Sequence, residues 1–374
     1  MRANKVETLT DNRKRGGFGR FLRRFLLLVF TLALLICGGL VLVLHTVFNG
    51  PSPAARNVLT MSLIEASATK WVPALFIGEE LVEEIRNQTG AELTSEVTDT
   101  SKVVINKAVT TEQIDQWKDY PDGIKIEEYQ GDYYVAYIML VKDPDQVYLA
   151  TSTNSFSKDK PGTRINNAIE TEKAAAAINA GAFYDDGTTS AVVGSIPLGL
   201  VYSQGNCVWD YGIPPEGGFA GFDRNGVLIV AKDLNRSEAD ALGIRDGCEF
   251  GPALIINGEI NQAAYEKNSG MNPRTAIGQR ADGTVIFVVV DGRQSGSLGA
   301  TFADMIDIMV EYDAVNACNM DGGSSAIMLY RDTYGRYGSP GQVQTISNYA
   351  LLQEQPRRMP DFWMIRSLTK LEKE

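Results

Sequence analysis

Residues 313–330 read DAVNACNMDGGSSAIMLY and contain two short apolar runs separated by an acid and two glycines. Such runs, bounded by turn residues, predict strands at Ala314–Asn319 and Ala326–Tyr330. The turn between them contains Asp321, and Gly322 and Gly323 allow the backbone to approach a ligand closely. The pattern predicts a sheet that presents a carboxylate at the rim of a cleft, although an ordinary Asp-Gly hairpin has the same pattern.

A second strand followed by an acid lies just upstream. Thr284–Val290, TVIFVVV, runs into Asp291, Gly292 and Arg293. Alternate residues of a strand share a face, so Asp291 and Arg293 would address one ligand if the extended geometry continued past Asp291. Asp291 and Asp321 are therefore a candidate pair of catalytic carboxylates.

The one histidine is His45, at the end of an apolar run near the N-terminus. The rest of the chain therefore has no histidine for a Ser-His-Asp or Cys-His nucleophile, for a histidine general base or for a His-rich zinc site. Acid and base chemistry falls to Asp, Glu, Tyr, Lys or Cys.

The N-terminal region predicts a membrane anchor. Leu26–Leu44 is uncharged over 19 residues, about the length that crosses a bilayer, and residues 1–24 carry a net charge of +6. The positive-inside rule places this basic tail in the cytoplasm and the main domain outside it. Pro51–Ala55 is a poor cleavage site, which favours an uncleaved signal anchor over a signal peptide. We expect one plasma-membrane span at residues 25–48.

Charge and cysteine content narrow the partners further. The chain has net charge −11, and removing the tail leaves −17 on residues 25–374. No nucleic-acid partner is expected, because binding to a phosphate backbone needs a basic face. Cys207, Cys248 and Cys318 are an odd set outside the membrane run, so we expect buried free thiols, with a Cys207–Cys248 bridge as the alternative.

Two regions follow the span. Residues 49–123 are predicted to form a membrane-proximal stalk, with an amphipathic stretch at Leu75–Arg86. From residue 124 to about 370, short apolar runs recur between turns, and helical patterns such as Phe302–Tyr312, with Thr301 as N-cap and Asp304 three residues on, are few. This predicts an α+β fold with a large mixed, mostly antiparallel sheet and a few packed helices.

Three further motifs follow or begin strands. Asn179 ends one strand in AINAGAFYDDG and either contacts a ligand or satisfies the amides of its own turn. Arg274 in NPRTAIG stands at a strand entry, where its guanidinium suits a phosphate or carboxylate, although a lone Arg commonly forms a surface salt bridge. Asn257-Gly258 is a type I′ hairpin signal.

The ensemble resembles a known family. NAGAFYDDG, GPALIINGE, NPRTAIG, VVVDGRQ, LGATFADM, NACNMDGGSSAIM and TISNYA occur in the order of the phosphodiester glycosidase family, and the resemblance covers residues 124–370. The chain departs from the family's Asn-Gly-Gly at Asn179-Ala180-Gly181 and from its Asp-Gly-Gly-Gly-Ser at Asp321–Ser325. The added methyl and hydroxymethyl would narrow the pocket and shift substrate choice, or weaken activity.

The resemblance implies hydrolysis of a sugar-1-phosphodiester between the anomeric carbon and oxygen, which yields a free sugar and a phosphomonoester. Arg274 and Arg293 would hold the phosphate. Asp321 would act as nucleophile, base or electrostatic stabiliser and Asp291 as acid, and the two roles are interchangeable at this point. Asn179 and Asn348 are candidates for contacts with the sugar and Ser324 for a donor to the phosphate, although each could equally hold a loop. Gly322 and Gly323 would let the backbone approach the substrate closely.

The expected function is that of a membrane-anchored extracytoplasmic hydrolase acting on phosphodiester-linked carbohydrate of the envelope or of exopolysaccharide. No cofactor is required, and a structural Ca²⁺ on the Asp-rich turns is an open alternative. Two rivals remain: a non-catalytic glycan-binding or wall-assembly protein that uses the same cleft, and a metal-dependent phosphodiesterase that cuts at phosphorus.

Overall fold

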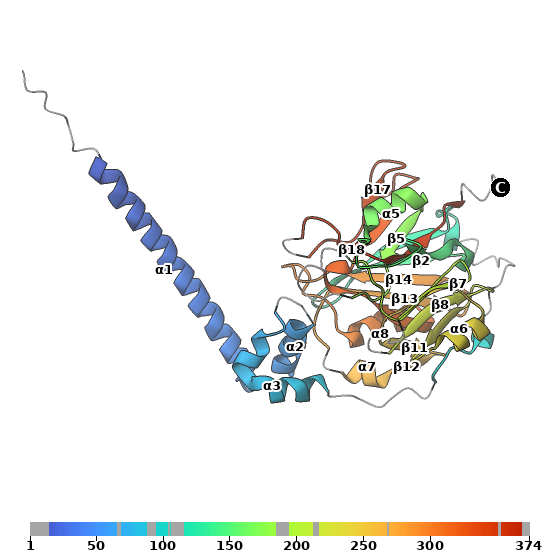
Figure 1. Ribbon diagram of the computed structural model, residues 1–374, viewed down its shortest axis with the longest axis horizontal. Coiled ribbons are helices and arrows are strands. Elements are labelled where there is room, and N and C mark those ends of the chain that lie inside the picture. Colours follow the sequence, from blue (N-terminus) through green and yellow to red (C-terminus); the bar gives the residue numbers. More distant parts are fainter. Residues whose placement is uncertain are drawn as a thin grey trace, which may run out of the picture.

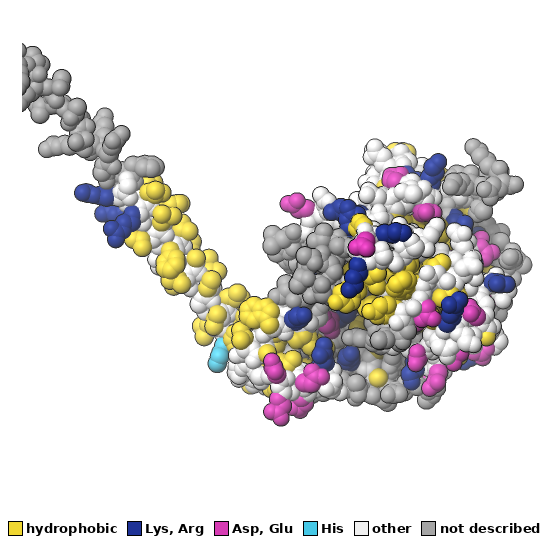
Figure 2. Space-filling model, viewed as in Figure 1, with side chains coloured by type: hydrophobic (Ala, Val, Ile, Leu, Met, Phe, Trp, Pro, Cys, Tyr) yellow, Lys and Arg dark blue, Asp and Glu magenta, His cyan; other side chains and the backbone are white. Residues whose placement is uncertain are grey.

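The computed structural model describes residues 15–65, 69–87, 95–103, 105, 116–184, 194–211, 217–267, 269–350 and 353–368. Helix α1 (Arg15–Phe48) contains the predicted span, and its 30 residues Gly19–Phe48 are long and apolar enough to cross a membrane. The helix projects away from the rest of the molecule (Figure 1). Apolar side chains cover it, and basic side chains gather near its start (Figure 2).

Two helices connect α1 to the strand-rich body. Helix α2 (Pro53–Ile64) begins at Ser52, whose hydroxyl accepts the Ala55 N–H, and α3 (Val72–Arg86) is kinked at Gly78, which has a φ of 79°. Phe48 at the end of α1 is buried and stacks on Phe76 of α3, with 5.1 Å between ring centroids. The two helices lie between α1 and the strands (Figure 1).

Among the described residues the strands form three main sheets, and every strand pair there is antiparallel. The first is β1-β2-β14-β13-β15-β11-β12, the second β7-β6-β10-β8-β9 and the third β17-β16-β5-β19-β3, beside a β18-β4 ribbon. The strands are β1 (Ile124–Gln130), β2 (Val135–Val141), β3 (Val147–Thr151), β4 (Thr163–Arg164), β5 (Ala176–Asn179), β6 (Leu200–Ser203), β7 (Asn206–Asp210), β8 (Phe219–Asp223), β9 (Leu228–Ala231), β10 (Ile244–Glu249), β11 (Ala253–Ile256), β12 (Glu259–Ile260), β13 (Arg274–Arg280), β14 (Val285–Val290), β15 (Ala314–Met320), β16 (Met328–Arg331), β17 (Val343–Thr345), β18 (Arg358–Met359) and β19 (Asp361–Ile365).

Helices α5 (Ile165–Glu172), α6 (Arg236–Leu242), α7 (Gln262–Glu266) and α8 (Phe302–Glu311) accompany the sheets. The α+β prediction is confirmed, but the strands divide among several sheets where one large sheet was expected. The capping box predicted at Thr301 and Asp304 is present at the start of α8.

Strand β14 shows why one predicted run has no polar face. Val285, Phe287 and Val289 point into the core between the sheets, whereas Ile286, Val288 and Val290 pack on the side of α8. A strand covered on both faces is apolar throughout, because alternate residues point to opposite sides.

Two alternatives left open by the sequence are resolved. Strand β15 belongs to the seven-stranded sheet and β16 to a five-stranded one, so the turn at Asp321 is not a hairpin. The four cysteines are free, with Cys248 and Cys318 buried, so the structure contains no Cys207–Cys248 bridge. The hairpin at Asn257-Gly258 is present: β11 pairs with β12, and both turn residues have positive φ.

The predicted stalk packs on the body across the boundary expected near residue 124. Val97 forms a bridge with Ala231, and Thr98 exchanges hydrogen bonds with Val230. Ser95 donates to Glu259 from both its N–H and its hydroxyl. The described part of residues 49–123 therefore belongs in part to the folded body.

Candidate active site

The register of three strands brings the predicted site residues together. Strand β13 lies between β14 and β15 and is antiparallel to both, with Arg274 opposite Val290 and Thr275 opposite Met320. The start of β13 therefore meets the ends of β14 and β15, where Asp291 and Asp321 follow. Because neighbouring strands are about 4.8 Å apart, the two acids leave the sheet on either side of Arg274, about 10 Å apart at the backbone.

Glycines allow these strand ends to pack closely. A Cβ on Gly292 would lie 2.6 Å from Pro273 N, and a Cβ on Gly322 would lie 2.6 Å from Pro273 O. Gly323 N–H donates to the same carbonyl at 2.8 Å. Gly322 and Gly323 thus hold the Asp321 turn against the entry of β13, and any larger residue at Gly322 would push the two apart.

Asp291 is buried, and its carboxylate accepts two hydrogen bonds from Asn348. The backbone N–H of Asn348 donates to Asp291 Oδ1 at 2.7 Å, and Asn348 Nδ2 donates to Oδ2 at 2.6 Å. Burial raises the pKa of Asp291, the Asn348 hydrogen bonds oppose this, and the charge of Glu128 adds to the rise. A raised pKa suits a group that must keep a proton to donate. Asn348 also donates to the Tyr137 hydroxyl.

Asp321 is fixed through its backbone. Its N–H donates to Ala180 O at 3.0 Å, and its carbonyl accepts from Asn179 Nδ2. Its Oδ1 accepts the Gly322 N–H at 2.9 Å. The Asn179 side chain is fully buried, and its Oδ1 accepts from Thr275 and from the Ile327 N–H. In the structure Asn179 therefore ties three strand ends together.

Arg274 faces a partner that the sequence did not suggest. Its Nη2 lies 2.8 Å from Glu65 Oε2, at the end of α2, and also donates to Gly270 O. Its Nε donates to Ala300 O, and its guanidinium lies 4.2 Å from the centre of the Phe302 ring. Arg274 is thus buried and oriented, with its charge set against a carboxylate of the predicted stalk.

Arg293 does not continue the strand. Its φ is 56°, a left-handed backbone conformation that is uncommon outside glycine, so the extended geometry ends before it. Its Nη2 donates to Asn272 Oδ1 at 2.9 Å. The condition under which Asp291 and Arg293 would share a strand face is therefore not met. The Arg293 guanidinium instead passes close to Gly323, within 3.4 Å of a Cβ placed there.

Ser324 lies on the Asp321 loop and is tied to a later segment. Its carbonyl accepts from Gln353 Nε2 at 2.8 Å, and its hydroxyl accepts from Arg357 Nη1 at 3.5 Å. Arg357 also lies over the Phe183 ring, 4.8 Å from its centre. The loop that carries Asp321 therefore has a third arginine beside it, which the sequence analysis did not identify.

Two buried carboxyl groups near the Asn179 turn were also missed. Asp361, at the start of β19, accepts the Gly181 N–H at 2.8 Å, and burial raises its pKa to about 7, with a smaller contribution from the charge of Asp321. Burial likewise raises the pKa of Glu249 to about 7. Nothing in the local pattern marks them, because their burial depends on strands far apart in the chain.

The residues of the candidate site suit a cation poorly. Both oxygens of Asp291 already accept hydrogen bonds from Asn348. Within the described ranges, three or more His, Cys, Asp or Glu residues do not gather at one place. A structural Ca²⁺ stays a prediction, and the described residues of the candidate site do not supply a cluster of acidic ligands for it.

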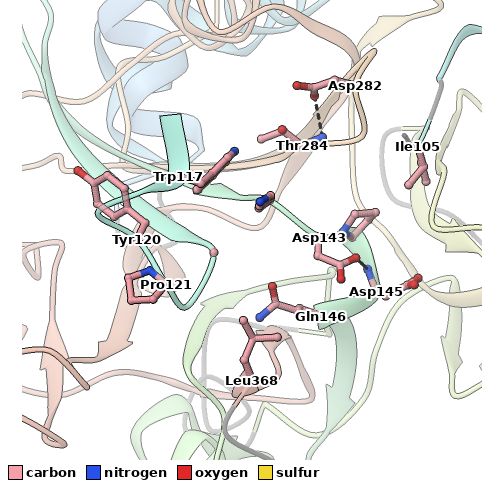
Figure 3. A pocket seen from close by; sticks show the side chains of 13 residues that line it. Ile105, Trp117, Tyr120, Pro121, Asp143, Asp145, Gln146, Asp282, Thr284 and Leu368 are labelled. Atoms are coloured by element: carbon pink, nitrogen blue, oxygen red, sulfur yellow. Dashed lines mark hydrogen bonds between the residues drawn. The ribbon is translucent and has the colours of Figure 1, made fainter. Parts of the chain in front are cut away.

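A separate cavity of about 510 Å³ lies at the opposite end of the first sheet. Its lining includes Lys142 at the end of β2 and Thr284 before β14, together with Trp117, Tyr120 and Gln146 (Figure 3). Asp282 accepts the Thr284 N–H there at 2.9 Å. Because Asp291 stands at the other end of β14, this cavity is not part of the candidate site.

Comparison with known proteins agrees with this geometry. The family model for phosphodiester glycosidase matches residues 172–366, a little over half of the chain. The protein YomE from the SPbeta prophage of Bacillus subtilis is 37% identical over 95 residues, which cover 24% of this chain and 15% of that protein. Mouse N-acetylglucosamine-1-phosphodiester alpha-N-acetylglucosaminidase is 34% identical over 86 residues, 20% of this chain and 16% of the enzyme.

A solved structure extends the likeness to the whole body. The zebrafish N-acetylglucosamine-1-phosphodiester alpha-N-acetylglucosaminidase catalytic domain, auto-inhibited by its pro-peptide, has a TM-score of 0.53 at 18% identity and covers 76% of this chain and 92% of that one. It shows a shared fold. The matched segments of the curated relatives are short, but the family match spans the strands that hold Asp291, Arg274 and Asp321. The chain belongs to the phosphodiester glycosidase family.

Proposed function

We propose that the protein is a membrane-anchored extracytoplasmic hydrolase that removes a sugar from a sugar-1-phosphodiester of envelope or exopolysaccharide glycans. The observation that supports it most is the register that places Arg274 between the strand ends of Asp291 and Asp321. Family membership supports a glycosidase reaction, and the apolar helix α1 supports membrane anchoring.

In the proposed reaction, the bond between the anomeric carbon and the bridging oxygen breaks, and the oxygen of water ends on the sugar. The phosphomonoester leaves as a stabilised anion, so cationic groups that hold the phosphate matter more than full protonation of the leaving oxygen. Arg293, and Arg274 beside it, supply that charge. The oxocarbenium-like transition state needs a carboxylate, and the half-buried Asp321 on its glycine turn is assigned this role.

Asp291 is assigned the acid role. Burial favours its protonated form, which is the form that donates to the leaving oxygen, although the two bonds from Asn348 limit the effect. The opposite assignment of the two carboxylates predicts a different pH dependence of the rate.

Product analysis tests the proposal. The full-length protein in lipid nanodiscs is incubated in ¹⁸O-water with a panel of methyl diesters of sugar-1-phosphates. We expect ¹⁸O in the released sugar, and we expect Asp321→Asn to lower the rate by at least about a hundredfold. Asp313→Asn, the same change at the other end of β15, is the matched control and should retain the wild-type rate.

The rivals give other products. Incorporation of ¹⁸O into phosphate, lost on chelation, would support a metal-dependent phosphodiesterase. Binding of glycan without turnover across the panel would support the non-catalytic protein, for which the substitutions at Ala180 and Ser324 in the family motifs are the motivating observation.

A further inference from the structure

Three hydrogen-bond donors converge on the carboxylate of Glu65. Gly270 N–H donates to Glu65 Oε1 at 3.2 Å, while Asn272 Nδ2 and Arg274 Nη2 donate to Oε2 at 2.6 and 2.8 Å. We call Gly270, Asn272 and Arg274 the anion pocket. A backbone amide, a side-chain amide and a guanidinium aimed at one group form the kind of donor set that binds phosphate as well as carboxylate.

The surroundings of the anion pocket are more positive than one carboxylate requires. Asn272 Oδ1 accepts from Arg293 Nη2 at 2.9 Å, so one amide side chain links Arg293 to Glu65. Two guanidinium groups therefore face one carboxylate. A phosphodiester carries the same single negative charge as Glu65, so an exchange between them would leave no additional unpaired charge.

The pocket is built into the body, whereas Glu65 is brought to it by another segment. Asn272 and Arg274 are 3% and 7% exposed, and Arg274 is further fixed by Ala300 O and the Phe302 ring. Glu65 follows directly after α2 and keeps about a quarter of its side chain exposed. The donors would therefore keep their places if Glu65 left.

Helix α2 docks along a narrow edge. A Cβ on Gly270 would lie 2.3 Å from Ser62 N, and the Met271 N–H donates to the Ser62 hydroxyl at 2.9 Å. The helix adds no strand to a sheet, and it packs most extensively on α1 and α3. Its withdrawal would leave the hydrogen-bonded strands of the body in place.

We infer that the anion pocket is the subsite for the substrate's phosphate and that Glu65 is its internal ligand, displaced when a phosphodiester binds. The identity of the anion rests on the proposed function, but the convergence of donors on Glu65 does not. Substrate entry is then coupled to release of α2, which begins only a few residues after the membrane helix α1.

Anion binding tests the inference without turnover. Titration calorimetry on the full-length protein in nanodiscs uses inorganic phosphate and dimethyl phosphate as probes. We expect Glu65→Gln, which keeps the shape but removes the competing charge, to bind both probes about tenfold more tightly than wild type. Glu80→Gln, the same change at an exposed position of the α2–α3 region, should leave both affinities unchanged.

A second variant removes the competitor by another route. Gly270→Ala keeps the pocket's N–H but collides with the backbone of α2, so it should also tighten probe binding. Hydrogen exchange reports on the helix itself. Saturating phosphate should speed exchange of the amides of residues 53–64 in wild type, and Glu65→Gln should show faster exchange without phosphate.

The outcomes separate this inference from the proposed function. Equal, weaker or absent probe binding in Glu65→Gln and Gly270→Ala, or α2 amides that phosphate does not alter, would overturn it and leave Glu65 as a structural partner of Arg274. Tighter binding in both variants without hydrolysis of any diester would uphold the pocket and count against the glycosidase. Hydrolysis by the wild type, with probe binding unchanged in both variants, would support the glycosidase and overturn the inference about Glu65.

Discussion

At the scale of single residues, burial decides which carboxyl groups hold a proton near neutral pH. Asp361 is about 1% exposed, and its Oδ1 accepts the Gly181 N–H. Its Oδ2 lacks a hydrogen-bond partner among the described residues. An isolated charge there is costly, which is why burial raises the pKa of Asp361 to about 7.

This pKa shift predicts that Asp361→Asn stabilises the fold, by an amount that depends on pH. An unfolded Asp titrates near 3.9, so between about pH 4 and 7 the folded protein binds the extra proton and wild-type stability falls as pH rises. Asparagine keeps the acceptor for Gly181 and cannot ionise. The free energy of unfolding in urea should therefore favour the variant by close to zero at pH 4 and by at most about 4 kcal/mol at pH 8.

Asp332 is the matched control, because its pKa is lowered where that of Asp361 is raised. Burial alone would raise its pKa, but the N–H groups of Arg336, Tyr337 and Gly338 donate to its carboxylate and lower it overall. Asp332→Asn should therefore lose stability at pH 8, with a smaller loss once wild-type Asp332 is protonated. A gain in this variant, or a pH-independent effect of Asp361→Asn, would contradict the account.

Asn348 allows the two carboxylate roles to be distinguished. Its two hydrogen bonds favour ionised Asp291, so Asn348→Ala should raise the pKa of Asp291 further. If Asp291 is the acid, the alkaline limb of the pH–rate profile moves to higher pH. A shift of the acidic limb would instead assign Asp291 as the base and reverse the roles proposed here.

At the scale of elements, the entry of β13 organises the candidate site. Gly322 packs against the Pro273 carbonyl so closely that a Cβ would lie only 2.6 Å from its oxygen. This contact sets the distance between the Asp321 turn and Arg274. A side chain at Gly322 would therefore act on geometry, without removing a chemical group.

Gly322→Ala should accordingly lower kcat by about a hundredfold, because misplacing a reactive group by about 1 Å can cost that much. Gly296→Ala is the control, since a Cβ there meets nothing within 4 Å. Steady-state kinetics and far-ultraviolet circular dichroism of both variants check the prediction. Unchanged kcat in a folded Gly322→Ala protein would show that this contact does not position the site.

Helix α8 packs on the seven-stranded sheet that carries the candidate site. Its N-terminus depends on the reciprocal bonds of Thr301 and Asp304, and Phe302, Met305 and Met309 are buried in the core cluster that lines the sheet. Thr301→Ala should cost about 1 kcal/mol of unfolding free energy, measured in urea. Thr333→Ala, at an exposed turn, is expected to change it by less than about 0.5 kcal/mol.

At the scale of the whole molecule, α1 and the body form two separate parts joined by α2 and α3 (Figure 1). If α1 is an uncleaved anchor, the cellular protein retains α1 and stays in the membrane after carbonate extraction. A protease added outside spheroplasts should reach the body, and one added to inverted vesicles should not. A shorter soluble form would instead indicate a cleaved signal peptide.

Local patterns sufficed to predict much of the fold and part of the candidate site. The runs at β14 and β15, the capping box of α8 and the turn at Asn257 depend on neighbouring residues, because apolar periodicity, capping and positive φ act within a few positions of the chain. Asp291, Asp321 and Arg274 were identifiable for the same reason, since each adjoins such a strand.

The tertiary structure alone decided the partners of those residues. The strands at β15 and β16 enter different sheets, Asp361 is buried beneath the Gly181 turn, and Glu65 reaches Arg274 across 209 positions of the chain. No local preference encodes such contacts, because they follow from which apolar surfaces pack together when the whole chain folds. The sequence by itself therefore determined where carboxylates and arginines leave the strands, and packing determined what each of them faces.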